Sequence, residues 1–328
     1  MTQSPTDEEA ISEQERFEEL KRKARERLIA AHGPIAQALR GVKHRVAIFS
    51  GKGGVGKTVA TINLGSALQQ MGYRVGIFDA DIHGPAVPKS LGVLGRMETV
   101  SEHIGHHDLR FDPVLSRYGL KVVSVASIWP GEEVPIMWKG AHKMRSIRYF
   151  LSAVNWGVLD FLLVDLPPGT GDEVQTVMSS IPNLGGMIVV TTPQGISAMV
   201  CSKAISAARE LNAPLLGLIE NMSILVCPCC GTQIQLFGRP RGEQLARMME
   251  VPFWGSIPLA TEMGECVDEG IPVVVKYPDA PVSQAFHQMA ARLLASLNVE
   301  RPMSDAEAEM LAHRPRDHHK HEHEHHHF

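Results

Sequence analysis

An eight-residue stretch, GKGGVGKT at positions 51–58, constrains the fold of this chain more than any other. It fits the pattern G-x-x-x-x-G-K-[ST] and stands between the apolar run Val46–Phe49 and a segment with helical spacing of apolar residues. In such a loop the backbone N–H groups turn inward as an anion-binding nest, and the positive end of the following helix reinforces it. Lys57 is then expected to reach the β- and γ-phosphates of a nucleotide, and the Thr58 hydroxyl to bind Mg²⁺. The residues expected around the phosphates are Gly51, Lys52, Gly53, Gly54, Val55, Gly56, Lys57 and Thr58.

The same stretch also satisfies the dinucleotide fingerprint G-x-G-x-x-G, and Asp79 ends the next apparent strand where a ribose-binding acid would stand. The pair Lys57-Thr58 has no use in a dinucleotide site. A second acidic strand end follows further along the chain, at Asp165. Both features favour a phosphate-binding loop.

Apolar runs of strand length alternate with helical patterns over most of the chain. A helical pattern starts at Thr58 and is closed by Gly72, and another covers Ala141–Val154. Strands are expected at Val46–Ser50, Arg74–Asp79, Lys121–Ala126, Phe161–Asp165, Met187–Thr192, Leu215–Glu220 and Phe253–Ile257. This order predicts an α/β fold with a doubly wound, mostly parallel sheet, whose ligands bind at the carboxyl ends of the strands.

Acidic residues follow two of these strands. Asp165 comes at the end of a buried run and is expected to hold Mg²⁺ together with Thr58. Asp81 lies just beyond another strand end and is the candidate for positioning the attacking water. Its neighbour Asp79 competes for that role, and local sequence does not choose between them.

The chain has five cysteines, and three of them lie in Cys227-Pro228-Cys229-Cys230. Cys227 and Cys230 form C-x-x-C, a spacing at which two thiolates bind one metal or one edge of a cluster. Because no second pair exists, a four-thiolate site is most simply built from two copies of the chain. A redox C-x-x-C and half of a zinc site remain alternatives.

Composition limits the other possibilities. The chain has 328 residues, 44% of them apolar, and a formal charge of −4, which gives no electrostatic footprint for nucleic acid. Neither a long apolar run nor a signal peptide is present, so we expect a cytoplasmic protein without a membrane partner. Three parts are expected: a charged helical extension at 1–42, an ATPase domain with the C-x-x-C at 43–297, and a disordered His-rich tail at 298–328.

Taken together, these motifs resemble the Mrp-type (ApbC-like) iron-sulfur carrier ATPases, a family with a deviant Walker A loop like that of partitioning ATPases and nitrogenase iron protein. The resemblance runs from about Val46 to Val275. Besides the loop it includes Asp79–Pro85, Asp165–Asp172, Thr191–Gln194, Glu220–Ser223, Cys227–Cys230 and Gly255–Leu259.

The resemblance implies a P-loop NTPase that binds and hydrolyses ATP with Mg²⁺ and carries a 4Fe-4S cluster for apo iron-sulfur proteins. It implies that Lys52 acts across a homodimer on the partner's nucleotide, with Lys57 and Asp81 completing the catalytic set. It also implies that Asn221 contacts adenine and that Cys227 and Cys230 bind the cluster. Ala86 replaces the usual serine of the switch segment.

Two other functions compete. A spatial-organising, partitioning-type ATPase would need a basic amphipathic helix or a basic patch, and the sequence offers neither. A nickel or zinc metallochaperone is favoured by the His-rich tail, but such proteins use a guanine-reading Asn-Lys-x-Asp motif that the sequence lacks.

Overall fold

The computed structural model describes residues 33–82, 84–93, 99–100, 110–124, 140–210, 212–227 and 229–312. The strands are β1 (Val42–Phe49), β2 (Val75–Asp79), β3 (Thr99–Val100), β4 (Arg110–Phe111), β5 (Val114–Leu115), β6 (Lys121–Ser124), β7 (Leu159–Asp165), β8 (Gly186–Thr191), β9 (Leu215–Glu220), β10 (Leu225–Val226), β11 (Gln233–Ile234) and β12 (Phe253–Ser256). The helices are α2 (Lys57–Gln70), α3 (Val87–Ser90), α4 (Gly140–Ala153), α5 (Asp172–Ser180), α6 (Gly195–Glu210), α7 (Gly242–Met248), α8 (Met263–Glu269), α9 (Val273–Lys276), α10 (Pro281–Ser296) and α11 (Asp305–Ala312). The charged segment Ser12–Leu28 and the histidines after residue 312 lie outside these residues.

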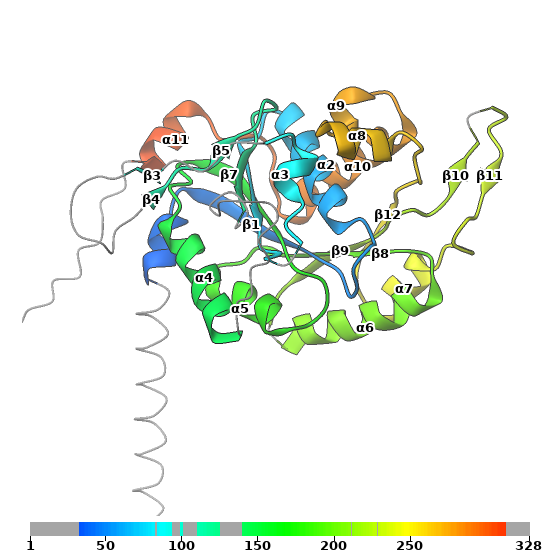
Figure 1. Cartoon of the computed structure of the whole chain (residues 1–328), viewed down its shortest axis with the longest axis horizontal. Coiled ribbons are helices and arrows are strands. Elements are labelled where there is room, and N and C mark those ends of the chain that lie inside the picture. Colours follow the sequence, from blue (N-terminus) through cyan, green and yellow to red (C-terminus); the bar gives the residue numbers. More distant parts are fainter. Residues whose placement is uncertain are drawn as a thin grey trace, which may run out of the picture.

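Eight strands form one sheet in the order β12-β9-β8-β1-β7-β2-β6-β5 (Figure 1). Seven of them run parallel, and only the edge strand β5 pairs antiparallel, with β6. The expected mostly parallel α/β sheet is therefore confirmed. From β1 the later strands are added on both sides, with β7 and β2 on one side and β8 and β9 on the other. The carboxyl ends of β1, β7 and β2 therefore lie side by side near the point where the strand order reverses.

Side chains of β1 alternate between the two faces of the sheet. Val46 and Ile48 join one buried cluster, to which α2, α3, α8, α9 and α10 contribute. Ala47 and Phe49 join a second cluster with α4, α5 and α6. Helices thus cover both faces, as Figure 1 shows, which is what a strand that is apolar at every position requires.

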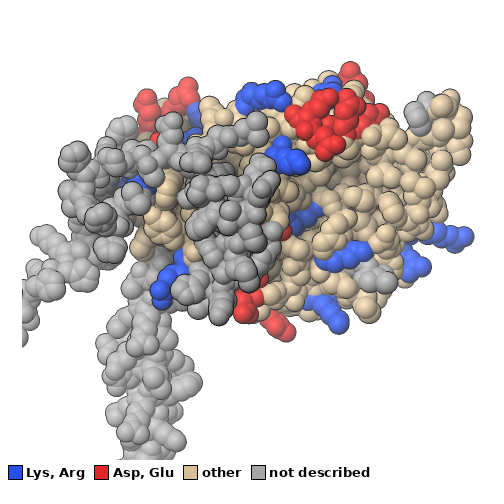
Figure 2. All heavy atoms as spheres, viewed as in Figure 1, with Lys and Arg blue, Asp and Glu red and all other residues tan. Residues whose placement is uncertain are grey.

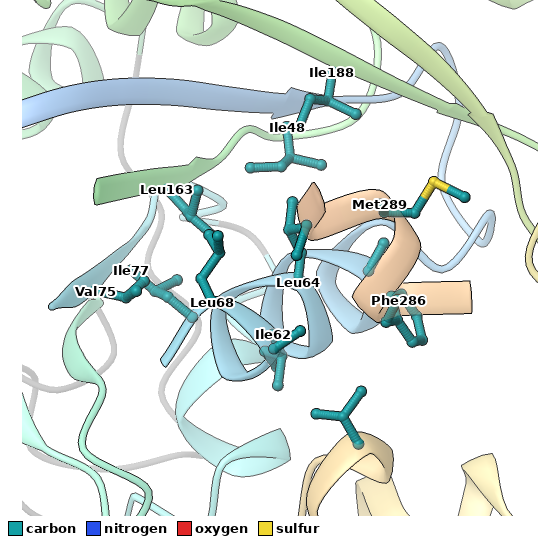
Figure 3. Close-up of a cluster of buried hydrophobic side chains, with 14 of the residues drawn as sticks. Ile48, Ile62, Leu64, Leu68, Val75, Ile77, Leu163, Ile188, Phe286 and Met289 are labelled. Atoms are coloured by element: carbon teal, nitrogen blue, oxygen red, sulfur yellow. The ribbon is translucent and has the colours of Figure 1, made fainter. Parts of the chain in front are cut away.

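Helix α2, which follows the loop at 51–58, is deeply packed. Figure 3 shows Leu64 and Leu68 of α2 between Leu163 of β7 and the α10 side chains Phe286 and Met289. Beyond α2 the Gly72 and Tyr73 N–H groups bond the carbonyls of residues 69 and 68, which closes the helix as expected.

Strand β7 begins two residues earlier than the apolar run indicated, because it includes a buried acid. Asp160 is 2% exposed and accepts hydrogen bonds from the main-chain N–H groups of Arg74 and Met303, each at 2.8 Å. The segment between Arg96 and Tyr118, whose sequence has no clear periodicity and predicts a loop, contributes the two-residue strand β5 to the main sheet. Strands this short have no recognisable periodicity.

The packed body extends past both expected boundaries. Before residue 43, Ile35 and Leu39 are buried in the cluster under α4 and α5. After residue 297, Met303 is buried and Arg74 pairs with Asp305 at the start of α11. Isolated apolar residues in charged surroundings gave no sequence signal for this docking.

Candidate functional site

The loop at 51–58 connects β1 to α2 at the carboxyl edge of the sheet. Gly54 and Gly56 have φ angles of 76° and 78°, a left-handed conformation that favours glycine. A Cβ on Gly56 would lie 2.3 Å from Asn221 Nδ2, so no larger residue fits there. At Gly53 and Gly54 a Cβ would meet nothing within 4 Å, so this side of the loop is open to a ligand.

Three side chains of α2 converge on Asp165 at the end of β7. Lys57 Nζ lies 2.8 Å from Asp165 Oδ2, and the Thr58 hydroxyl donates to the same oxygen at 2.7 Å. The Thr61 hydroxyl donates to Oδ1, also at 2.7 Å. The predicted pair of Thr58 and Asp165 is therefore brought together, and Thr61 completes the carboxylate's set of donors.

These residues fit a magnesium nucleotide. Lys57 Nζ is buried and, in the part of the chain that the structure describes, meets no acceptor in hydrogen-bonding geometry, although it pairs with Asp165 by charge. A buried ammonium with unused donors suits phosphate oxygens. The Thr58 hydroxyl and the Asp165 carboxylate are hard oxygen ligands of the kind that Mg²⁺ takes alongside phosphates.

Asp79 and Asp81 occupy different environments. Asp79 is buried at the end of β2, in register with Asp165 of β7, and accepts hydrogen bonds from the N–H groups of Asp81 and Val87 and from the Ser124 hydroxyl. Asp81 is half-buried, and its Oδ1 accepts the Gly84 N–H at 3.1 Å. Asp79 therefore fixes the segment from which the Asp81 carboxylate projects.

Complete burial raises the pKa of Asp79 to about 8, and the nearby charge of Asp165 adds to the effect. Hydrogen bonds from the main chain and the charge of Lys57 act in the opposite direction but are weaker. Two carboxylates in register at adjacent strand ends resist ionising together. Burial and the charge of Asp165 therefore favour the protonated form of Asp79 in the nucleotide-free protein.

Lys52 lies on the exposed side of the loop. Its Nζ donates to Gln194 Oε1 of the same chain at 2.7 Å, in the segment between β8 and α6. The Lys52 side chain is half-buried, but its hydrogen bond to Gln194 lies at the surface, where a second chain can reach it.

Asn221 follows β9 and contacts the phosphate-binding loop directly. Its Nδ2 donates to the Val55 carbonyl at 2.9 Å, and its main-chain N–H bonds the Thr191 carbonyl at 2.8 Å. The side chain that the resemblance assigns to adenine thus also supports the loop by a hydrogen bond to its main chain.

Cys227 and Cys230 lie in the turn of the hairpin β10–β11. We call residues 224–238, which leave the body and return to it, the cysteine arm; Figure 1 shows it projecting from the end of the molecule. Cys227 is half-buried, whereas Cys229 and Cys230 are exposed. Within the described residues, no three His, Cys, Asp or Glu side chains gather as one chain's metal site.

The turn favours the thiolate of Cys230. Cys230 Sγ lies 3.2 Å from the Thr232 hydroxyl, and hydrogen bonding with that hydroxyl and with the Thr232 main chain holds the pKa of Cys230 below its usual range, to which Cys227 adds. Thiolates, not thiols, bind metals.

The arm carries no charge. No Asp, Glu, Lys, Arg or His occurs between Met222 and Gly238, and the part of the space-filling view at the upper right, where the arm projects, is free of red and blue, with blue side chains only below it (Figure 2). Its exposed apolar side chains are Val226, Ile234, Leu236 and Phe237. Burying such a surface against a partner costs little desolvation free energy, because it contains no charged Asp, Glu, Lys, Arg or His side chain.

Sequence reasoning missed several residues of the site. Thr61 gave a signal, since it lies one turn after Lys57 on a helix face that is otherwise apolar. Glu220, a buried acid at the end of an apolar strand, gave the same signal as Asp165. Gln194 lies in a motif that carries the resemblance but was assigned no role, and Ser124 gave no signal, because its partner Asp79 is distant in sequence.

A family model described as ParA, NUBPL iron-transfer P-loop NTPase, matches residues 41–294. The chain is 44% identical over 253 residues to the iron-sulfur cluster carrier protein of Methanocaldococcus jannaschii, covering 77% of this chain and 84% of that protein. It is 39% identical over 273 residues to the protein of the same name from Saccharolobus solfataricus, covering 83% and 90%.

Solved structures agree with these sequence matches. A nucleotide-binding protein from Archaeoglobus fulgidus in complex with ADP is 36% identical, with a TM-score of 0.62 over 73% of this chain and 91% of that one. The MinD cell division protein of Aquifex aeolicus is 22% identical, with a TM-score of 0.54 over 77% and 97%, and shows likeness of fold alone. No helix among the described residues is long and apolar enough to cross a bilayer.

Proposed function

Because the chain belongs to the iron-transfer P-loop NTPase family, we propose that it binds and slowly hydrolyses ATP while carrying a 4Fe-4S cluster for apo iron-sulfur proteins. One observation carries the proposal: a single chain combines a phosphate-binding loop joined to Asp165 with an uncharged arm that presents Cys227 and Cys230. The expected cytoplasmic location is part of the same proposal.

The nucleotide roles follow from the contacts. Lys57 would exchange its pairing with Asp165 for the β- and γ-phosphates, since its ammonium has unused donors. Thr58 and Asp165 would hold Mg²⁺, which neutralises phosphate charge when bound. Asn221 would contact adenine with its amide oxygen, because Nδ2 is occupied by Val55.

Asp81 is proposed to orient the attacking water. Its carboxylate is partly exposed, whereas that of Asp79 is enclosed by main-chain donors and Ser124. Lys52 is proposed to leave Gln194 and act on the nucleotide of a partner chain, which is supported by the position of its hydrogen bond to Gln194 at the surface.

The cluster, as cargo, is proposed to bridge two chains. A 4Fe-4S cluster takes four thiolates, and each chain offers Cys227 and Cys230 on an exposed turn. The apolar side chains around that turn support pairing of two arms. Cys229 is not proposed as a ligand, because Cys227 and Cys230 complete the C-x-x-C without it.

Anaerobic reconstitution with iron and sulfide tests the proposal. We expect about one cluster per two chains, with visible absorption that is lost in Cys227→Ser and in Cys230→Ser. Cys229→Ser is the matched control, exposed in the same turn, and should keep the absorption. The double variant at 227 and 230 should still bind ATP, since the phosphate-binding loop is separate.

Two results would contradict the proposal. A complete cluster on a monomer would exclude the bridged arrangement. Zinc as the only bound metal after anaerobic reconstitution would point to a closed structural site instead.

A further inference from the structure

Two consecutive residues at the end of β9 touch two different parts of the molecule. Asn221 reaches the phosphate-binding loop through the Val55 carbonyl. Glu220, 1% exposed, turns to the other side and accepts the main-chain N–H groups of Arg241 and Gly242, both at 2.7 Å. Residues 241 and 242 are where the cysteine arm returns to the body and α7 begins.

The outgoing leg of the arm is held just after Asn221. The Ser223 N–H and hydroxyl both donate to the Ile257 carbonyl, at 3.0 and 3.1 Å. The Leu259 N–H bonds the Ile224 carbonyl at 2.8 Å. From Leu225 onward the arm is partly or fully exposed. The arm therefore leaves the body from a fixed base and not from a loose loop.

The return leg is held by Glu220 at close range. A Cβ on Gly242 would lie 2.7 Å from the Glu220 Cβ, so the backbone packs directly against this acid. The second carboxylate oxygen of Glu220 accepts the Ser256 hydroxyl at 3.3 Å. Hydrogen bonds from N–H groups to a buried carboxylate are among the stronger ones in proteins. Glu220 thus joins the ends of β9 and β12 and the start of α7.

Resting on the proposed function, we propose that Glu220 is a positioning residue that transmits the state of the nucleotide site to Cys227 and Cys230. A shift of the phosphate-binding loop moves Asn221 through Val55, and Glu220, its neighbour, moves the return leg with it. Both legs of the arm would then move together, because the outgoing leg follows Asn221 in the chain and the return leg is hydrogen-bonded to Glu220. Glu220 itself touches neither the phosphate-binding loop nor the cysteines in any of its described contacts.

The test measures alkylation of the arm thiols in the cluster-free full-length chain, with and without Mg-ATP, alongside ATP affinity by calorimetry. Wild type should show a change in the alkylation rate of Cys230 of about fivefold or more on ATP binding, the lower range of ordinary coupling between sites. Glu220→Ala should lose this response and keep wild-type ATP affinity. Glu220→Gln should retain it, because the amide oxygen still accepts the two N–H groups.

A second variant covers the case in which Glu220→Ala does not fold. Gly242→Ala leaves the carboxylate in place but pushes the return leg away from it, and should also weaken the response. Glu243→Ala is the matched control. This neighbouring acid is exposed on α7 and pairs only with Arg247 among its described contacts, so the response should remain.

The inference would be overturned by a wild type whose thiols do not respond to ATP, by a full response in both Glu220→Ala and Gly242→Ala, or by a loss of ATP affinity in step with the loss of response. A response that depends on chain concentration would also overturn it, since association would then be the cause. Failure of cluster reconstitution leaves this test intact, because no cluster is used. Conversely, if the chain binds the cluster but its thiols fail this test, only the proposed role of Glu220 is contradicted and the proposed function stands.

Discussion

Lys57 Nζ lies 2.8 Å from Asp165 Oδ2, and the two side chains are only 7% and 1% exposed. The ammonium offered to a nucleotide is therefore held by a carboxylate of the neighbouring strand β7. Phosphate oxygens of a bound nucleotide would compete with that carboxylate, so we expect ATP binding to release Lys57 from Asp165.

Replacing Lys57 should weaken both nucleotide binding and the fold. Lys57→Ala removes a charged hydrogen-bond donor, and we expect Mg-ATP affinity to fall by about tenfold to a hundredfold. It also leaves Asp165 without its cation, which should lower the free energy of unfolding by about 3 kcal/mol. Lys52→Ala, in the same loop but only half-buried and without a charged partner in its described hydrogen bond, should change that free energy by less than about 0.5 kcal/mol. Calorimetry and urea unfolding measure the two effects, and equal destabilisation by both variants would contradict the assignment.

Stability of the nucleotide-free protein should fall as pH rises. Asp79 has a pKa of about 8 when folded and about 4 when unfolded, so between these values only the folded state holds the proton. The free energy of unfolding is then greatest below pH 4 for this group and decreases by up to about 1.4 kcal/mol per pH unit until about pH 8.

Asp79→Asn should flatten this dependence, since the amide resembles the protonated acid and does not titrate. Asp268→Asn, at an exposed acid of α8, serves as the control and should keep the wild-type slope. Urea unfolding across this pH range, without Mg²⁺, provides the measurement. Identical slopes in wild type and Asp79→Asn would show that Asp79 is ionised in the folded chain.

Asp81→Ala should separate binding from turnover. The carboxylate is expected to act only on the attacking water, so phosphate release should slow by about a hundredfold while ATP affinity stays unchanged. Asp279→Ala, an exposed acid at the start of α10, should affect neither quantity. Undiminished turnover in Asp81→Ala would show that another group orients the attacking water.

The histidines at the end of the chain should form a separate metal site. Seven of them lie between His318 and His327, and neutral imidazoles bind Ni²⁺ and Zn²⁺. Truncation after Pro315 should abolish Ni²⁺ binding measured by calorimetry near neutral pH and leave cluster loading intact. Loss of cluster loading in the shortened chain would place the tail in the main site.

The sequence predicted those parts of the site whose residues are close along the chain. The loop at 51–58 and the acid ending β7 belong to short motifs with a defined chemistry, and alternating apolar segments placed both at one edge of a parallel sheet. The contacts of Asn221 with Val55 and of Glu220 with Gly242 join residues far apart in sequence. No periodicity encodes such pairs, because they depend on how β9 is placed beside β8 and β12.

Asp160 also decides where the chain can be shortened. The apolar pattern fades after residue 298, but a cut there would remove Met303. Of the two main-chain N–H groups described as donating to this buried carboxylate, only that of Arg74 would remain. A cut after Ala312 keeps both donors and the contact of Arg74 with Asp305. Deletion variants of the tail are therefore interpretable only from the second position onward, since the first would mix loss of the histidines with a damaged fold.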